Sequence, residues 1–198
     1  PWHSRLLAFA QSRRPGWMGR RLALLARRLV LSGRSLPIDA SAEGLRLRVH
    51  VADNVSERKY LFMPQFVDTT ERAYLVGHLT PDGVFLDIGA NAGIYTLTAA
   101  RAYARLGGRG YALAVEANPT MQERLRYNVA LNELDAHARL APLALSNRDG
   151  EVAFSLSNSN LGESGLLAAG GKTIKVPCLT LASLLAQQGI ERPDGLKI

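Results

Sequence analysis

The sequence of 198 residues contains one cysteine, Cys178, so an internal disulfide and a cysteine-rich metal site are both excluded. Charged residues interrupt every stretch of eighteen residues, and the sequence therefore predicts no membrane-spanning helix. Internal repeats and low-complexity tracts are also absent. What remains is the composition of a globular domain of ordinary size, without a metal and with the cytoplasm as its expected location.

Positive charge is concentrated at the start of the chain. Residues 1–50 hold ten arginines and two acids, whereas residues 51–198 are almost neutral. Met18, Leu22, Leu25 and Leu29 recur at helical spacing with arginines between them, a pattern typical of an amphipathic basic helix. We expect a basic helical arm, residues 1–44, followed by one domain, residues 45–198.

The apolar face of this helix needs a partner. Packing on the domain is the first expectation. Contact with an anionic membrane surface, or with nucleic acid or another acidic partner, is the alternative. Arginines split the apolar stretch, so the segment does not resemble a secretory signal.

Strand and helix patterns alternate through the rest of the chain, which predicts an α/β fold with an open parallel sheet. Helices are expected at residues 69–79, 93–105, from 119 onward and 181–188. In the helix at 93–105, Ile94, Leu97 and Ala104 are expected to face inward. Core strands are expected at 84–88, 111–115, 139–146 and from 194; further strands are expected at 45–52, 151–156 and 172–179.

The segment "VFLDIGANAGIYTL", residues 84–97, joins the first core strand to its helix. In open α/β sheets, ligands bind beyond the carboxyl ends of the strands, where this turn lies. Gly89 and Gly93 would allow the backbone to approach a ligand closely, and amides at the helix start favour an anionic group. Glu116, at the end of the adjacent strand, can accept hydrogen bonds from two ribose hydroxyls.

The glycine spacing discriminates between nucleotide ligands. The dinucleotide pattern G-x-G-x-x-G is not present from Gly89 onward, and no Gly-Lys-Ser/Thr phosphate loop follows. The spacing D-x-G-x-x-x-G suits S-adenosylmethionine, whose ammonium group Asp87 would approach directly or through water. Alternatively, the glycines only permit a tight turn and Glu116 is a solvated strand end.

Five ordered segments resemble the FkbM family of class I methyltransferases. They are "VFLDIGANAGIYTLTAA", "AVEANP", "NVALN", "LALSNRDGEVAF" and "PDGLKI", and the resemblance covers about residues 66–198. It implies a Rossmann-like sheet with helices on both faces and strand order 3-2-1-4-5-7-6. It also implies methyl transfer from S-adenosylmethionine, commonly to a hydroxyl of a sugar, lipid or secondary metabolite, with no nucleic-acid partner expected.

The resemblance also assigns residues. The cofactor loop corresponds to Asp87, Gly89, Ala90, Asn91 and Gly93, and the ribose acid to Glu116 with its neighbours Ala117 and Asn118. Ala117 replaces a proline that is more usual after this acid. Ala144, Leu145 and Ser146 match a segment that lines the adenine. Glu71 and Asn160 are further candidates, and the resemblance identifies no catalytic base.

The family pattern normally continues after "LKI" with an acid and a glycine, and then with the strands that wall the acceptor site. We therefore expect the sheet to be incomplete after its fourth core strand, and this segment to be poorly soluble or to self-associate when expressed alone. An NAD(P)-dependent oxidoreductase and a non-catalytic module that acts through the basic arm remain alternatives to the methyltransferase.

Overall fold

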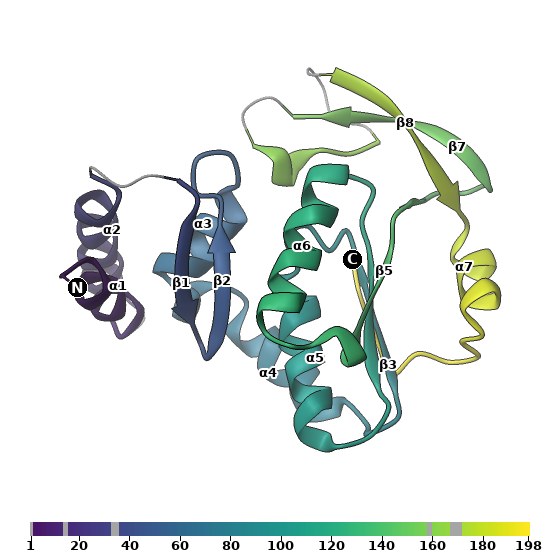
Figure 1. Cartoon of the computed structure of the whole chain (residues 1–198), viewed down its shortest axis with the longest axis horizontal. Coiled ribbons are helices and arrows are strands. Elements are labelled where there is room, and N and C mark those ends of the chain that lie inside the picture. Colours follow the sequence, from purple (N-terminus) through teal and green to yellow (C-terminus); the bar gives the residue numbers. More distant parts are fainter. Residues whose placement is uncertain (1, 14–15, 33–35, 158–159, 167–171) are drawn as a thin grey trace. The chain divides into compact units, whose positions relative to one another are not determined.

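A computed structural model describes residues 2–13, 16–32, 36–157, 160–166 and 172–198 (Figure 1). The chain forms two compact units, Pro1–Glu71 and Arg72–Ile198. The domain boundary expected between residues 44 and 45 falls in the turn of a hairpin, and the first unit continues beyond it to Glu71. Among the described residues, no helix has the length and apolar character needed to cross a bilayer.

The first unit combines helices with a two-stranded hairpin. Its elements are α1 (Trp2–Gln11), α2 (Trp17–Leu31), β1 (Ile38–Ala42), β2 (Leu45–Val49), α3 (Val55–Phe62) and η1 (Pro64–Phe66). The strands β1 and β2 pair antiparallel, and α1 and α2 pack against each other. The expected basic helix is present as α2, but its buried residues are Ala23, Ala26 and Val30. Met18, Leu22, Leu25 and Leu29, the face expected to pack on the domain, are exposed within the first unit, and their packing on the domain stays a prediction.

The second unit is built around a four-stranded parallel sheet. Its core strands are β3 (Val84–Ile88), β4 (Tyr111–Val115), β5 (Ala138–Ala141) and β9 (Gly195–Lys197). Their order in the sheet is β5-β4-β3-β9, which is the 3-2-1-4 order expected for the first four strands. The connecting helices are α5 (Ile94–Leu106), α6 (Pro119–Leu131) and α7 (Leu181–Gln188), with α4 (Thr69–His78) and η2 (Asp135–His137) beside them.

Helices cover both faces of this sheet because successive residues of a buried strand point to opposite sides. On one face, Phe85 packs with Ala99 and Tyr103 of α5. On the other face, Leu86 packs in a cluster that includes Leu184 of α7 and Ile190. The α/β fold with helices on both faces is therefore confirmed.

A three-stranded sheet is formed by the segment between core strands β5 and β9. It contains β6 (Ala144–Leu145), β7 (Gly150–Leu156) and β8 (Lys172–Leu179) in the order β6-β8-β7, and η3 (Leu161–Glu163) lies between β7 and β8 in sequence. The single strand expected at 139–146 is wrong, because β5 ends at Ala141 and β6 belongs to this second sheet. Pro142 lies at the break, where it has no N–H to continue the ladder.

Most helix ends follow local sequence signals. Asn118 caps α6 by accepting a hydrogen bond from Thr120, and Pro119 begins the helix. Gly107 and Gly189 end α5 and α7 in the left-handed conformation. The inward face expected for α5 is partly wrong: Leu97 is buried, but Ala104 is exposed and Tyr103 takes its place in the core.

Candidate functional site

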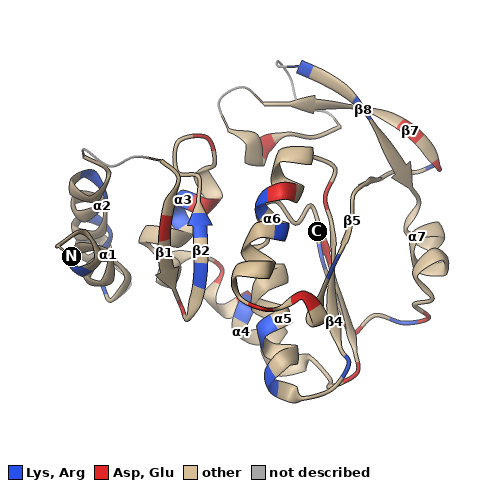
Figure 2. Cartoon of the chain, viewed as in Figure 1, with Lys and Arg blue, Asp and Glu red and all other residues tan. Residues whose placement is uncertain are grey.

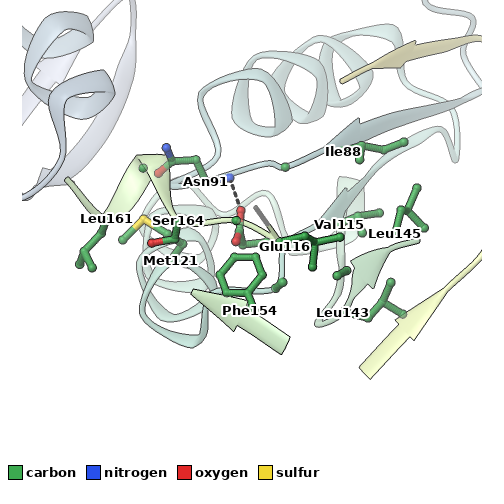
Figure 3. Close-up of a pocket in the computed structure, with 16 residues that line it drawn as sticks. Ile88, Asn91, Val115, Glu116, Met121, Leu143, Leu145, Phe154, Leu161 and Ser164 are labelled. Carbon is green, nitrogen blue, oxygen red and sulfur yellow. Dashed lines mark hydrogen bonds between the residues drawn. The ribbon is translucent and has the colours of Figure 1, made fainter. Parts of the chain in front are cut away.

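A cavity of about 210 Å³ lies at the carboxyl edge of the parallel sheet (Figure 3). Its walls come from the ends of β3 and β4, from the segment after β5, and from β7 and residues 161–166. This is the edge at which open α/β sheets bind ligands. Figure 3 labels the main lining residues, which are Ile88, Asn91, Val115, Glu116, Met121, Leu143, Leu145, Phe154, Leu161 and Ser164.

The loop after β3 contains two glycines that are needed for different reasons. Both have positive φ, +69° at Gly89 and +90° at Gly93. A Cβ atom at Gly89 would meet no heavy atom within 4 Å, and this residue lines the cavity. A Cβ atom at Gly93 would collide with the side chain of Leu125 in α6. Gly89 therefore leaves space at the cavity, whereas Gly93 allows α5 to pack closely on α6.

Glu116 connects the two loops at the sheet edge. Its Oε2 accepts a hydrogen bond from the Asn91 amide at 2.7 Å (Figure 3). Its Oε1 accepts one from the Asn118 amide, also at 2.7 Å. The residue is only 7% exposed. Burial raises the pKa of Glu116, the two amides oppose that rise, and the charge of Asp87 adds to it. A buried carboxylate held in this way is preorganised to accept hydrogen bonds from a ligand.

Asp87 lies at the end of β3 but is not part of the cavity wall. Its Oδ2 accepts hydrogen bonds from the Thr96 amide at 3.0 Å and from the Thr96 hydroxyl at 2.6 Å. Its Oδ1 lies 3.7 Å from the Nζ atom of Lys197. Burial raises the pKa of Asp87, although the charge of Lys197 and the bonds from Thr96 oppose this. Asp87 thus anchors the start of α5 and pairs with a cation of the chain itself.

Lys197 was not identified from the sequence. The parallel pairing of β3 with β9 places Lys197 directly opposite Asp87. Its Nζ atom also lies 5.5 Å from the centroid of the Tyr95 ring. The available signal was the expected adjacency of the first and fourth core strands, which brings the lysine of "LKI" beside the acid of "FLDIG".

The remaining walls of the cavity are mostly apolar. Ala117 and Ala144 line it as expected, together with Met121, Leu143 and Phe154, which the sequence did not reveal. Phe154 belongs to a buried cluster of the three-stranded sheet, so this sheet contributes a wall. A flat apolar ligand group would fit between such side chains.

Residues 161–166 are tied to the loop after β4. The Asn118 Nδ2 atom donates to the Leu161 carbonyl and to the Ser164 hydroxyl, both at 3.4 Å. Asn160 accepts a hydrogen bond from Gly162 and caps η3, so in this structure it shapes the segment. Both asparagines hold the cavity wall in place, although neither of them lines it.

The structure thus brings six of the expected cofactor residues into the cavity wall: Gly89, Asn91, Glu116, Ala117, Ala144 and Leu145. The others lie outside the lining: Asp87, Ala90, Gly93, Asn118 and Ser146. The Ala90 amide donates to the Val115 carbonyl, and the Ser146 amide donates to the Leu179 carbonyl. Glu71, in the first turn of α4, belongs to the first unit and stays a prediction.

Imidazoles do not line the cavity. The Nδ1 atom of His78 lies 2.8 Å from the Tyr74 carbonyl, and that of His137 lies 2.8 Å from the Gly110 carbonyl. Across the described part of the chain, His, Cys, Asp and Glu side chains form no group of three that could hold a metal ion. The cavity therefore offers a carboxylate, the polar residues Asn91 and Ser164, backbone groups and apolar walls to a ligand.

Comparison with known proteins gives one family match. Residues 87–198 match the sequence model of the methyltransferase FkbM domain. A search of curated proteins gives no match.

Similar solved structures include TYW2 of Pyrococcus horikoshii in complex with MeSAdo, with 20% identity and a TM-score of 0.45 over 63% of this chain and 47% of that one. The tRNA m1G37 methyltransferase of M. jannaschii has 20% identity and a TM-score of 0.42 over 61% and 38%. A SAM-dependent methyltransferase from Agrobacterium tumefaciens has 17% identity and a TM-score of 0.41 over 58% and 35%. The chain spans less than half the length of each of these three proteins.

Proposed function

The chain belongs to the FkbM methyltransferase family, and on this premise we propose that it forms the cofactor-binding part of an S-adenosylmethionine-dependent methyltransferase. The observation that carries the proposal is the position of Glu116, a buried acid at the end of β4 that lines the cavity and is held by two backbone amides. An acid in this position suits the two vicinal hydroxyls of a ribose.

The residues of the cavity fit the adenosine portion of the cofactor. Glu116 would accept the ribose hydroxyls, and Ala117, Ala144, Leu143 and Phe154 would enclose the adenine with apolar surface. Each carboxylate oxygen of Glu116 has a second lone pair, so both amide bonds can persist when a ribose binds. The loop after β3 lacks the dinucleotide glycine spacing, and no Gly-Lys-Ser/Thr follows it to receive a diphosphate, which disfavours the oxidoreductase alternative.

The methionine portion of the cofactor is assigned to the loop after β3. The Asn91 amide donates to Glu116, and the Ala92 amide donates to the side chain of Asn91, so this part of the loop is already ordered. Asp87 was expected near the ammonium group of the cofactor. Because it is buried and faces Lys197, we propose that it acts by fixing the start of α5 and the charge of Lys197.

When bound, S-adenosylmethionine supplies a methyl group on a positively charged sulfur. The chain's part in the reaction is to orient this group and to exclude water around it, because placement accounts for much of the rate of such a transfer. An alcohol acceptor would also need a general base within hydrogen-bond reach.

The acceptor that we propose is a hydroxyl of a sugar, a lipid or a secondary metabolite, as the family resemblance implies. One of the similar solved structures is named as a tRNA methyltransferase. An assay of methyl transfer should therefore include an RNA as an alternative acceptor. The cytoplasm, where S-adenosylmethionine is made, stays the proposed location.

Isothermal titration calorimetry tests the proposal. The chain is titrated in parallel with S-adenosylmethionine, with its demethylated product S-adenosylhomocysteine and with NAD. Saturable binding of the two adenosyl compounds, without binding of NAD, is the expected result. Binding of NAD alone would refute the methyltransferase assignment and restore the oxidoreductase.

A further inference from the structure

The helix α2 presents an apolar face that the described residues of its own unit leave exposed. Met18, Leu22, Leu25 and Leu29 follow one another four, three and four residues apart, so they lie on one side of the helix. Their exposed fractions are 60%, 38%, 55% and 46%. We call these four residues the apolar stripe. Trp17, at the start of the same helix, is 70% exposed.

The apolar stripe is not the surface by which α2 packs in its own unit. The buried residues of α2 are Ala23, Ala26 and Val30, and the helix packs against α1 and α3. Small side chains at these positions allow close packing of the helices, while the larger leucines are left outside. Substitution of the stripe should therefore leave the fold of the first unit intact.

Arg21 and Arg28 flank the apolar stripe on one side. The segment Trp17–Leu31 contains four arginines, Arg20, Arg21, Arg27 and Arg28, and no acid (Figure 2). The guanidinium carbon of Arg21 lies 5.5 Å from the centroid of the Trp17 ring. Partial burial lowers the pKa of Arg27, and the charges of Arg58 and Arg28 lower it further. Like charges are thus crowded on this helix without acids of its own to balance them.

A partner for this helix must accept the bulky apolar side chains of the stripe together with the positive charges of Arg21 and Arg28 beside it. A second copy of the helix would cover the stripe but would bring arginines against arginines. Nucleic acid would neutralise the arginines but would leave the leucines in water. A bilayer surface with anionic lipids satisfies both requirements, because leucines enter the acyl boundary while arginines remain among the phosphates.

We propose that α2 lies in the interface of an anionic membrane, with the apolar stripe inserted and Arg21 and Arg28 at the headgroups. Trp17 fits this arrangement, since tryptophan is enriched at the level of the headgroups. This inference rests on the first unit alone and does not depend on the proposed methyltransferase function.

Vesicle cosedimentation of the full chain tests the proposal. Vesicles of phosphatidylcholine alone are compared with vesicles that contain phosphatidylglycerol as well. We expect binding to the anionic vesicles, with affinity about tenfold weaker or more in Leu25→Gln/Leu29→Gln. Arg21→Gln/Arg28→Gln should weaken it by at least about tenfold at low salt. Leu106→Gln, an exposed leucine of α5, is the matched control and should change nothing.

Fluorescence gives a second measurement that does not depend on affinity. The chain has two tryptophans, so Trp2→Phe leaves Trp17 as the single reporter. Its emission should shift to shorter wavelength on anionic vesicles, and 0.5 M salt should reverse much of the shift because electrostatic attraction is screened.

Three results would overturn the proposal. The first is equal binding by the Leu25→Gln/Leu29→Gln variant and the wild type. The second is self-association that this variant abolishes in sedimentation velocity, which would assign the stripe to a second copy. The third is binding to a nucleic-acid duplex, at the same salt concentration, that is tighter than binding to anionic vesicles.

Discussion

Replacement of Glu116 by alanine tests the cavity most directly, because this carboxylate both joins two loops and lines the site. Its two oxygens accept the amides of Asn91 and Asn118, each at 2.7 Å. A bound ribose would add hydrogen bonds to the remaining lone pairs. The substitution therefore has one effect on binding and another on folding, and the two can be measured separately.

The effect on binding follows from the strength of hydrogen bonds to a charged group. Loss of these bonds costs about 1.5–3 kcal/mol of binding free energy, which raises the dissociation constant for S-adenosylmethionine by about 10- to 160-fold. The effect on folding has two opposing parts. Each backbone amide that loses its hydrogen bond costs about 1–3 kcal/mol of stability. In the opposite direction, the variant no longer has to bury a charged carboxylate; burial of this group is unfavourable, as the raised pKa of Glu116 indicates. We expect a net loss of about 1–3 kcal/mol in the free energy of unfolding.

Calorimetric titration with S-adenosylmethionine and S-adenosylhomocysteine measures the first effect, and urea unfolding measures the second. Glu123→Ala is the matched control, because Glu123 is an exposed acid on α6 and its removal changes the net charge equally. The control should keep the wild-type affinity. A folded Glu116→Ala variant with an unchanged dissociation constant would refute the assignment of Glu116 to the ribose.

Two further predictions concern the edges of the site. Gly93→Ala should destabilise the fold by about 2–4 kcal/mol, because it combines a positive φ with a collision against α6. Gly107→Ala, which has positive φ and open space, should cost only about 1 kcal/mol in the same urea assay, and an equal cost would contradict the collision. Lys197→Met should destabilise by about 1–3 kcal/mol, since it leaves a buried carboxylate without its cation. Burial raises the pKa of Asp87, so its ionisation costs stability as the pH rises through that pKa, and loss of Lys197 raises the pKa further. The loss of unfolding free energy caused by Lys197→Met should therefore grow with pH in unfolding titrations. A loss that is independent of pH, or an equal loss in the exposed Lys175→Met control, would argue against the Asp87–Lys197 ion pair.

Local signals in the sequence predicted most of the fold. The buried strands Val84–Ile88 and Tyr111–Val115 are found at the expected residues. The cap at Asn118 and the stop at Gly189 also hold, because a helix end depends on the few residues around it. The glycine turn and Glu116 come from the same kind of signal, since they lie directly after strands that an apolar run identifies.

Other features depend on which segments meet, and the sequence alone did not reveal them. The residues after Ala141 leave the parallel sheet and pair with β8, which brings Phe154 and residues 161–166 to the cavity. The partnership of Lys197 with Asp87 needs the register of β3 against β9. In α2, the periodicity of the leucines correctly predicted a helix, and within the first unit this helix packs through Ala23 and Ala26, whose small side chains allow a close approach.

The sequence by itself therefore determined most elements of this protein, the position of the glycine loop after β3 and the acid beside it, because each is specified by neighbours in the chain. Only the tertiary structure decided which segments wall the cavity, which cation pairs with Asp87, and which side of α2 packs within the first unit. These depend on contacts between residues far apart in the sequence, or on competition between two apolar faces, and packing geometry settles both.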